Sequence, residues 1–332
     1  MVNQNGCDPT VVTVHHNNPW VQSRGCWNSI ASKRPTCGSL LAELVIMKIN
    51  RRAQQRTVEI VSNKRVGAYH HMIFAVGDMA LHALPGNFVA ISVGGPGSAM
   101  VLRKAFAIYR THDRGNYGGT LELVVAQHGQ GSKWLTALPM HATVDMVGPL
   151  GTSFGIPTEP VNALLVGGGY GSAPLFGLAE LLKDGGSRVD MVLGASSAGK
   201  IYAPLEGKRA VNSMTITTDD GSAGTKGQVV SVLAGLIERY DVDIIYSCGP
   251  MAMLAAIQDI ATQTGIMHQC AVEEAMACGI GVCMTCVVPL RDETGLVKMS
   301  RSCIDGPVMD GASVLWNSSG KIPDGTFGAP NV

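Results

Sequence analysis

The sequence predicts a protein of three structured parts: an antiparallel β-barrel, a doubly wound parallel α/β sheet and a small C-terminal domain rich in cysteine. Residues 57–158 hold short β runs broken by Gly and Pro, which is typical of a small barrel. Residues 159–265 alternate strand and helix patterns. Residues 266–320 contain five of the nine cysteines, four of them crowded into residues 278–303, and have no helical period. The predicted class is therefore α/β plus all-β.

The β runs of the first part are closely spaced. They read TVEIVSN, HHMIFAV, NFVAISV, FAIYRT, LELVVAQ and TVDMVG. In the second part, ALLVGGG predicts a buried strand and APLFGLAELLKDG a helix that ends at Gly185. RVDMVLGA, MTITTDDG and VDIIYSCG predict further strands, and residues 228–240 and 251–263 predict helices. These strands and crossover helices predict a parallel sheet.

The two ends of the chain lack such patterns. Residues 1–56 are rich in Asn, Ser, Gly and Arg, and we expect an extension that is mostly disordered; residues 321–332 form a tail. A sharper hypothesis is that translation starts at Met47, because strand-like patterning begins shortly after it. The first 20 residues have neither a basic nor an apolar segment, which argues against a secretory signal.

Charge and hydropathy exclude some classes of partner. The 25 basic and 25 acidic residues cancel, so no charge excess indicates nucleic acid or a membrane surface. No apolar run reaches the roughly 18 residues that a membrane span needs. The expected compartment is the cytoplasm.

The crowded cysteines follow the pattern C-x4-C-x2-C-x16-C. They are Cys278, Cys283, Cys286 and Cys303. A plant-type 2Fe–2S cluster uses this C-x4-C-x2-C spacing followed by a distant fourth cysteine. Gly279 and Gly281 let the loop approach the cluster and direct N–H groups at its sulfurs, and RDETG predicts the hairpin turn before the fourth ligand. Two alternatives are a structural zinc, which favours paired C-x2-C units, and unrelated buried cysteines.

A glycine cluster separates the first strand of the α/β part from its helix. Gly167, Gly169 and Gly171 allow a tight turn that brings a pyrophosphate close to helix N-terminal amides. From Gly169 the pattern is G-x-G-x-x-P, with Pro174 in the first helical turn. The alternative is a glycine-rich turn of an ordinary α/β protein.

A second strand-to-helix turn strengthens the prediction of a dinucleotide site. In YSCGPMAML a strand ends at Cys248, Gly249 and Pro250 and a helix follows. The carboxyl ends of parallel strands line the ligand crevice, which places Cys248 near a bound dinucleotide. A free Cys is nevertheless often only a small core residue. No Ser/His/Asp or Cys/His catalytic set is present, and hydride transfer does not need one.

Taken together, these segments resemble the electron-transfer subunit of class 1B dihydroorotate dehydrogenase, within the ferredoxin–NADP reductase-like superfamily. The resemblance runs in family order over residues 58–316. Its matching stretches are PGNFVAISV, VLRKAFAIY, HGQGSKWLTAL, VDMVGPLGTSFG, LLVGGGYGSAPL, TTDDGSAGTKGQV, IIYSCGPMAMLAAI and EEAMACGIGVCMTC…SCIDGPVMDG.

The resemblance implies one FAD per chain between barrel and dinucleotide domain, one 2Fe–2S cluster on the third domain, and NAD as acceptor. It also implies an FMN-containing catalytic subunit that oxidises dihydroorotate in pyrimidine biosynthesis, in a heterotetramer of two plus two subunits. The stretch GASSAGKIYAP has one Lys and no Arg, which favours NAD over NADP.

The segments that hold the flavin in this family match less closely. Its Arg-Pro-x-Ser segment falls on Lys104, Ala105, Phe106 and Ala107, where the planar fork of Arg and the hydroxyl of Ser are lost. Arg103, one residue earlier, is a candidate substitute. The other implied flavin positions are Val124, Val125, Ala126, Gly131 and Ser132.

Two rival functions stay open at this point. One is the reductase subunit of another NAD(P)H-linked iron–sulfur flavoprotein system with the same modules. The other is a redox sensor that keeps the cluster and has lost flavin turnover, which the altered flavin positions motivate.

Overall fold

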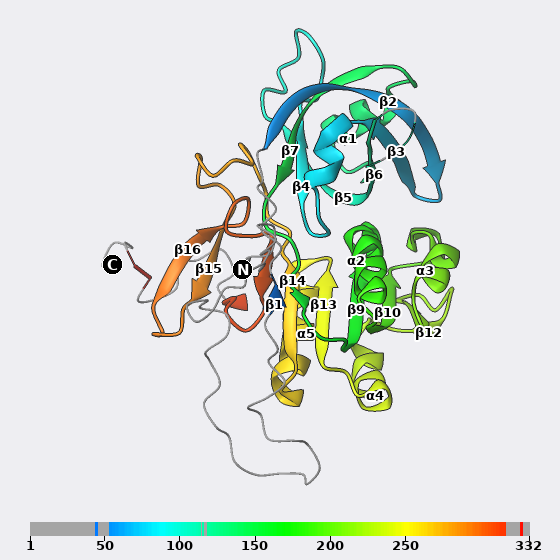
Figure 1. The fold of residues 1–332 in the computed structure, drawn as a ribbon, viewed down its shortest axis with the longest axis vertical. Coiled ribbons are helices and arrows are strands. Elements are labelled where there is room, and N and C mark those ends of the chain that lie inside the picture. The colour runs from blue at the N-terminus through cyan, green and yellow to red at the C-terminus, as the bar shows by residue number, and fades with distance from the viewer. Residues whose placement is uncertain (1–43, 46–52, 114, 116–117, 317–325, 328–332) are drawn as a thin grey trace, which may run out of the picture.

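The computed structural model describes residues 44–45, 53–113, 115, 118–316 and 326–327. Three parts meet along one line (Figure 1): a barrel, an α/β sheet flanked by helices, and a hairpin region. The predicted fold class is confirmed. No helix among the described residues is long and apolar enough to cross a membrane.

The barrel closes in the order β2-β3-β6-β5-β4-β7, and each pair is antiparallel. Its strands are β2 (Gln54–Val66), β3 (Tyr69–Ala75), β4 (Phe88–Ile91), β5 (Lys104–His112), β6 (Thr120–Ala126) and β7 (Thr143–Leu150). Alternate apolar side chains point inward, and Ile60, Met72, Phe74, Leu121 and Leu123 are fully buried there. The 3₁₀ helix η1 (Gly77–His82) and helix α1 (Gln130–Ala137) complete it. The strand runs in the sequence did not reveal α1.

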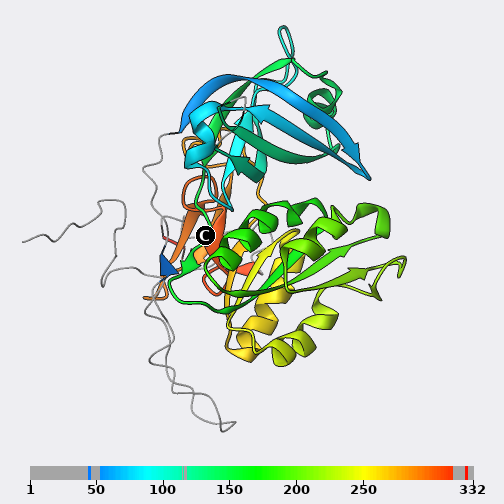
Figure 2. The ribbon, with the colours of Figure 1, turned by 45° about the vertical axis from the view of Figure 1, so that its right-hand side comes forward.

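The α/β part is one seven-stranded sheet in the order β12-β11-β10-β9-β13-β14-β17. Its strands are β9 (Asn162–Gly168), β10 (Arg188–Ala195), β11 (Ser213–Thr218), β12 (Thr225–Lys226), β13 (Ile244–Cys248), β14 (Met267–Ala271) and β17 (Val308–Asp310). All neighbours are parallel except β14 and β17. The carboxyl ends of its parallel strands therefore lie at one edge of the sheet, which faces the barrel (Figure 2).

Helices cover both faces of this sheet. Leu175, Phe176 and Leu178 of α2 (Ala173–Asp184) pack on one face, together with residues next to α3 (Pro204–Ala210). Leu233 of α4 (Val230–Tyr240) and Ile257 of α5 (Met251–Thr264) pack on the other. The predicted helices at 228–240 and 251–263 are thus confirmed to within a few residues, and Gly185 ends α2 as expected. The 3₁₀ helices η2 (Gly169–Ser172) and η3 (Ala198–Lys200) follow β9 and β10.

The cysteine-rich part is built on a hairpin of β15 (Val287–Arg291) and β16 (Val297–Arg301). The strands β14 and β17 fall inside the residues 266–320 that the sequence assigned to this domain, yet they belong to the α/β sheet. A boundary near residue 272 therefore describes the sheet better than one at 265. Sequence patterns did not reveal this because β17 is short and returns from a distant segment.

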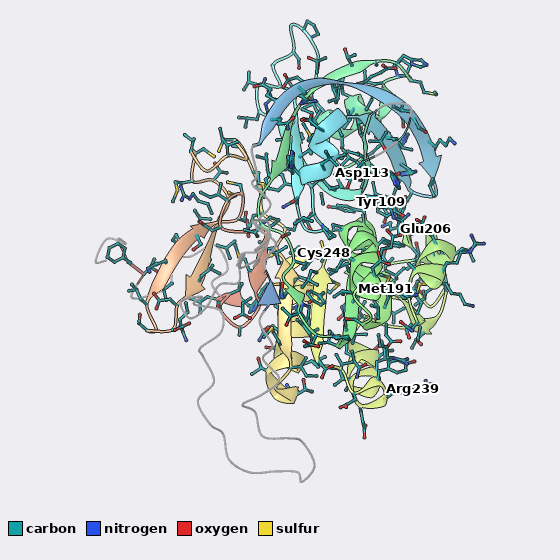
Figure 3. All side chains as sticks on the ribbon, viewed as in Figure 1. Tyr109, Asp113, Met191, Glu206, Arg239 and Cys248 are labelled. Atoms are coloured by element: carbon teal, nitrogen blue, oxygen red, sulfur yellow. The ribbon has the colours of Figure 1, made fainter. Side chains whose placement is uncertain are left out.

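The barrel and the sheet are joined by an aromatic and ionic contact, in which Tyr109 is buried and the two carboxylates are partly exposed. Tyr109 of β5 donates a hydrogen bond of 2.6 Å to Glu206 of α3, and the Arg110 guanidinium pairs with both Glu206 and Glu180 of α2. Figure 3 shows Tyr109 and Glu206 approaching each other across the boundary. Edge-to-face contacts of Tyr109 with Phe176 extend the interface. This contact fixes the barrel against the strand ends.

The predicted N-terminal extension contains some regular structure. Backbone pairing joins β1 (Leu44–Val45) to β8 (Ile156–Pro157), and β2 begins at Gln54 rather than near Thr57. The residues of β1 precede Met47, so a start at Met47 would remove this pair. Most of the predicted N-terminal extension and of the predicted tail 321–332 lies outside the described residues. The structure describes only residues 44–45 and 53–56 of the extension and residues 326–327 of the tail.

Candidate functional site

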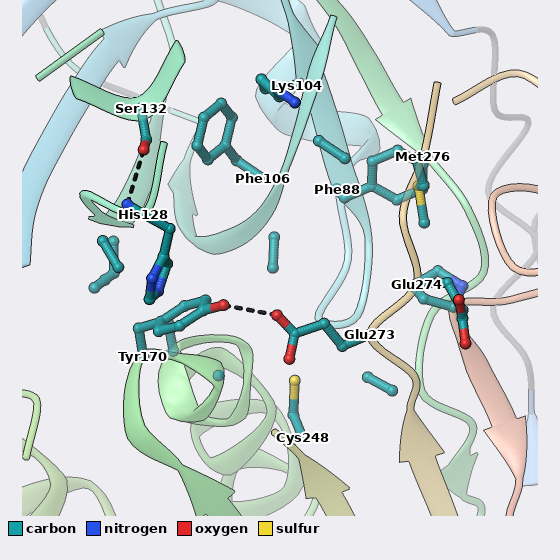
Figure 4. A pocket seen from close by; sticks show the side chains of 18 of the residues that line it. Phe88, Lys104, Phe106, His128, Ser132, Tyr170, Cys248, Glu273, Glu274 and Met276 are labelled. Atoms are coloured by element: carbon teal, nitrogen blue, oxygen red, sulfur yellow. Dashed lines mark hydrogen bonds between the residues drawn. The ribbon is translucent and has the colours of Figure 1, made fainter. Parts of the chain in front are cut away.

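A pocket of about 680 Å³ lies between the barrel and the strand ends of the sheet (Figure 4). This size is typical of ligand and cofactor sites. Most of the predicted flavin and dinucleotide positions line it: Lys104, Ala105, Phe106, Ala107, Val124, Ala126, Gly131, Ser132, Gly171, Cys248 and Gly249. Four predicted positions do not line it: Val125, Gly167, Gly169 and Pro250.

The barrel wall of the pocket combines small side chains on β5 and β6 with the larger Phe106 and Val124. Ala105, Ala107 and Ala126 leave a shallow apolar surface. Val125 lies between two lining residues on β6, so its side chain points into the barrel core, where it is 1% exposed. Lys104 supplies a positive charge at the upper end (Figure 4). This wall suits a planar aromatic group that carries a phosphate.

Arg103 does not take the place of the missing arginine fork. Its guanidinium pairs with the Asp145 carboxylate and donates to the Asp145 carbonyl oxygen at 3.2 Å. Arg103 is not among the lining residues. Lys104 is therefore the basic side chain that β5 presents to the pocket.

The N-terminus of α1 opens onto the same space. The Ser132 hydroxyl accepts hydrogen bonds of 3.1 Å from the N–H groups of both His128 and Gly129, so it caps its own helix. No acidic residue lies in the first turn, which leaves the positive end of the helix dipole uncompensated. Gly131 is needed for packing, because a Cβ there would lie 2.9 Å from Val93 and 3.2 Å from Lys104. The free amides of this turn suit a pyrophosphate.

Two strand-to-helix turns form the sheet wall. A Cβ on Gly171 would lie 2.9 Å from the Cα of Gly249, so these two glycines let the turns touch backbone to backbone. Gly169 adopts a φ of +56°, which a glycine tolerates best. Gly167 packs against Ser172, where a Cβ would come within 2.5 Å. These glycines thus serve the geometry of the turns, and Gly171 and Gly249 line the pocket.

Sequence reasoning missed three polar groups that lie inside the pocket. The Tyr170 hydroxyl donates to Glu273 Oε1 at 2.7 Å, and the rings of His128 and Tyr170 lie 5.1 Å apart (Figure 4). Burial, the hydrogen bond and the charge of Glu273 all raise the pKa of Tyr170. The glycine turn and the stretch EEAMACGIGVCMTC were visible in the sequence, but nothing local shows that Tyr170 and Glu273 meet.

Cys248 lies beside Glu273 at the carboxyl end of β13. Desolvation, reinforced by the negative charge of Glu273, raises the pKa of Cys248 to about 12. The thiol is therefore neutral at physiological pH and is not a thiolate nucleophile. Pro250 follows as the N-cap of α5 and sets the direction of that helix.

The four cysteines of the motif come together as an outer and an inner pair. The outer pair is Cys278 and Cys283, of which Cys283 is exposed. The Val282 N–H donates to Cys278 Sγ at 3.3 Å, and the Thr285 hydroxyl donates to Cys283 Sγ at 3.2 Å. Hydrogen bonds from Thr285, and then from Cys278, lower the pKa of Cys283 to about 6. A lowered pKa favours the thiolate form of Cys283, which is the form that binds metal.

The inner pair is Cys286 and Cys303, which are 2% and 1% exposed. Burial raises the pKa of Cys303 to about 12, and a hydrogen bond with Cys286 adds to the shift. Cys303 lies in a turn two residues beyond β16, after the hairpin that RDETG predicted. The inner pair packs in one apolar cluster with Phe88 and Met276.

This arrangement fits a two-iron cluster. Two pairs of cysteines match two irons with two thiolates each. Gly279 and Gly281 adopt positive φ of +70° and +83°, which bends the loop around the site.

Comparisons with known proteins agree with this geometry. Residues 273–315 match the family model described as the iron-sulfur cluster binding domain of dihydroorotate dehydrogenase B. The electron transfer subunit of dihydroorotate dehydrogenase B (NAD(+)) from Caldanaerobacter subterraneus subsp. tengcongensis is 32% identical over 258 residues, which cover 77% of this chain and 97% of that protein. The subunit of the same name from Bacillus cereus is 34% identical over 263 residues, or 77% and 96%.

Solved structures show the same architecture. The structure of an NADH-dependent reduced ferredoxin-NADP oxidoreductase superimposes with a TM-score of 0.69 at 28% identity, covering 79% of this chain and 91% of that one. A ferredoxin reductase of carbazole 1,9a-dioxygenase has a TM-score of 0.54 at 21% identity over 66% and 68%, and shows the fold alone. This chain belongs to the family of electron transfer subunits of dihydroorotate dehydrogenase B.

Proposed function

We propose that this chain passes electrons from a dihydroorotate-oxidising partner subunit to NAD⁺, through a 2Fe–2S cluster on its four paired cysteines and an FAD in the pocket. One observation carries the proposal. Phe88 and Met276 pack against the inner pair of cysteines and also line the pocket. The cluster site and the flavin site therefore share one wall.

The residues of the pocket divide the work of holding the two nucleotides. Lys104 and the amides of the first turn of α1 hold the FAD phosphates, and the small side chains of β5 and β6 receive the ring system. The backbone at Gly171 and Gly249 admits NAD at the strand ends. When bound, the cluster exchanges single electrons and the flavin combines two of them into a hydride for NAD⁺.

The outer pair of cysteines suits an approach by the partner. Cys283 is exposed, whereas Cys286 and Cys303 are covered by protein. Electrons enter at the outer pair and leave toward the pocket from the inner pair. We propose an FMN-containing catalytic subunit as partner, in a heterotetramer of two plus two chains in the cytoplasm, within pyrimidine biosynthesis.

The domains follow from the same assignment. We propose that the barrel binds FAD; it covers residues 57–158 and extends back to the start of β2. We propose that the α/β part, which begins near residue 159, binds NAD. The cluster domain covers the remainder to residue 320, apart from β14 and β17.

Co-expression with the dihydroorotate dehydrogenase catalytic subunit of the same genome tests the proposal. We expect the two chains to co-purify and the complex to form orotate at a rate that depends on NAD⁺. A complex that forms no orotate with NAD⁺, while NADH drives dye reduction by this chain, would establish the rival reductase function instead.

A second function, a cluster-bearing redox sensor, is favoured by the loss of the arginine fork at Lys104. It predicts a chain that contains the cluster, binds no FAD and reduces no dye with NADH. Dye reduction by the isolated chain under anaerobic conditions excludes it.

A further inference from the structure

Ser302 is a buried polar residue next to a cysteine of the inner pair. It is 0% exposed, and its hydroxyl oxygen has no hydrogen-bond partner among the described residues. Buried hydroxyls in native proteins are almost always satisfied, so an unpaired one needs an explanation. One explanation is a bound group that brings a hydrogen-bond acceptor next to the Ser302 hydroxyl.

The strand register places Ser302 beside the sulfurs. The last paired residues of the hairpin are Val287 and Arg301, and the Ser302 N–H extends the ladder by donating to the Cys286 carbonyl oxygen at 2.8 Å. Ser302 therefore stands opposite Cys286. Directly opposed residues of an antiparallel pair have their side chains on the same face, with Cβ atoms about 4.5–5.5 Å apart. The Ser302 hydroxyl is thus within reach of the Cys286 sulfur.

The outer pair offers a direct comparison. There the Thr285 hydroxyl already donates to Cys283 Sγ at 3.2 Å. The inner pair has a hydroxyl of the same kind beside it, but the Ser302 hydroxyl forms no such bond. A metal-bound thiolate is a stronger acceptor than a thiol because it carries negative charge.

We propose that the Ser302 hydroxyl donates a hydrogen bond to the metal-bound Cys286 thiolate and raises the reduction potential of the cluster. The inference rests on the cluster site of the proposed function. Reduction adds one electron to the cluster and increases the negative charge on its sulfurs, so a donor stabilises the reduced form more than the oxidised form. Ser302 is therefore a positioning and tuning residue.

An EPR-monitored redox titration of the full chain, purified anaerobically, tests this role. In Ser302→Ala we expect the ratio of reduced to oxidised cluster at a fixed ambient potential to fall about tenfold, which equals about 59 mV for a one-electron couple. Ser302→Thr keeps a hydroxyl and should retain the native potential. Ser300→Ala is the matched control, because Ser300 lies on the same strand two residues away and pairs with Val288.

EPR detects only chains that contain a cluster, so incomplete loading of a variant does not obscure the result. Ser302→Val, which fills the space without a hydroxyl, gives a second measurement of the same shift. A deuterium-exchangeable proton coupled to the native cluster and absent in both variants supports the bond. Native reduction potentials in both Ser302→Ala and Ser302→Val would overturn this inference and leave the proposed function standing. A native chain with no 2Fe–2S signal would instead overturn the proposed function.

Discussion

The cysteine loop, residues 278–303, and the interdomain pocket differ in how many chain segments build them. The loop takes its outer pair and Cys286 from one short stretch, and Cys303 arrives through a single hairpin. The pocket takes its walls from β5, β6, the start of α1, two strand-to-helix turns and residues 271–276. Its geometry therefore depends on how the barrel sits on the sheet.

This difference has a physical consequence. Local backbone turns at Gly279 and Gly281 shape the loop, and its inner pair of cysteines packs against Phe88 of the barrel. The pocket loses its shape when either turn or the contact of Tyr109 with Glu206 moves. Changes in the loop should remove the cluster and spare nucleotide binding. Changes in the two strand-to-helix turns should weaken nucleotide binding and spare the cluster.

The largest effect is expected from Cys283→Ala. Cys283 is exposed, so its removal leaves no cavity and the fold should persist. Loss of one of four thiolates should abolish the cluster, with iron falling to near zero per chain, while FAD affinity stays unchanged. Iron analysis and an FAD titration measure the two. Met284→Ala, also on the exposed loop, is the control and should keep the iron. Full iron content in Cys283→Ala would contradict the ligand assignment.

Gly171→Val should damage nucleotide binding in the pocket and spare the cluster. Its new Cβ would lie 2.9 Å from the Cα of Gly249, which is a backbone atom. We expect the free energy of unfolding to fall by about 1–3 kcal/mol and NADH binding to be lost, with the cluster retained. Gly235→Ala lies inside α4, where a Cβ meets nothing within 4 Å, so it should keep native NADH affinity and raise the free energy of unfolding by up to about 1 kcal/mol. Native NADH affinity in Gly171→Val would show that the turns do not shape the site.

The sheet beneath the pocket gives a pH-dependent prediction. His268 is 2% exposed; its Nε2 accepts from Ser247 at 2.6 Å and its Nδ1–H donates to Gln258 at 2.9 Å. Burial lowers the pKa of His268 to about 3. Because the folded pKa lies below the unfolded value of about 6.5, the stabilisation is complete above that value and is lost as the pH falls toward 3.

The expected loss is about 1.4 kcal/mol of unfolding free energy per pH unit between about pH 6 and 4. Urea denaturation at several pH values measures this slope. His268→Gln should flatten it, whereas His141→Asn, at an exposed position, should leave it unchanged. Equal slopes in the native chain and His268→Gln would argue against a neutral buried histidine.

The smallest effect is expected at Lys104. Lys104→Gln removes the basic side chain of the barrel wall and should weaken FAD binding about tenfold at low salt. Lys133→Gln is the matched control, since Lys133 lies on α1 outside the pocket. The double change Lys104→Arg with Ala107→Ser restores a planar fork and a hydroxyl, and should tighten binding. Fluorescence titration with FAD compares all four chains, and equal dissociation constants would remove Lys104 from the flavin site.

Local patterns in the sequence were enough to predict the parts that are local in the structure. The strand–helix alternation, the glycine turn and the cysteine spacing each lie within one segment, and the structure places them as expected. Other features join distant segments: Tyr170 bonds to Glu273, Arg103 pairs with Asp145, and β17 joins the α/β sheet. No spacing rule reports such contacts, because tertiary packing decides them.

Helix α1 was missed for a related reason. Its sequence QGSKWLTA begins after glycine and is too short to show a helical period, so the barrel context dominated the prediction. The Ser132 cap was the available signal, because a hydroxyl three residues after the N-cap completes a capping pattern.

The proposed function requires that one chain connect NAD(H), a flavin and a 2Fe–2S cluster. An anaerobic titration of the purified chain with NADH, followed by absorption and EPR spectroscopy, tests it most directly. We predict that NADH bleaches the flavin band and that the signal of a reduced 2Fe–2S cluster then grows in. A chain whose cluster is reduced by dithionite, but whose flavin and cluster both stay oxidised with excess NADH, would contradict the account.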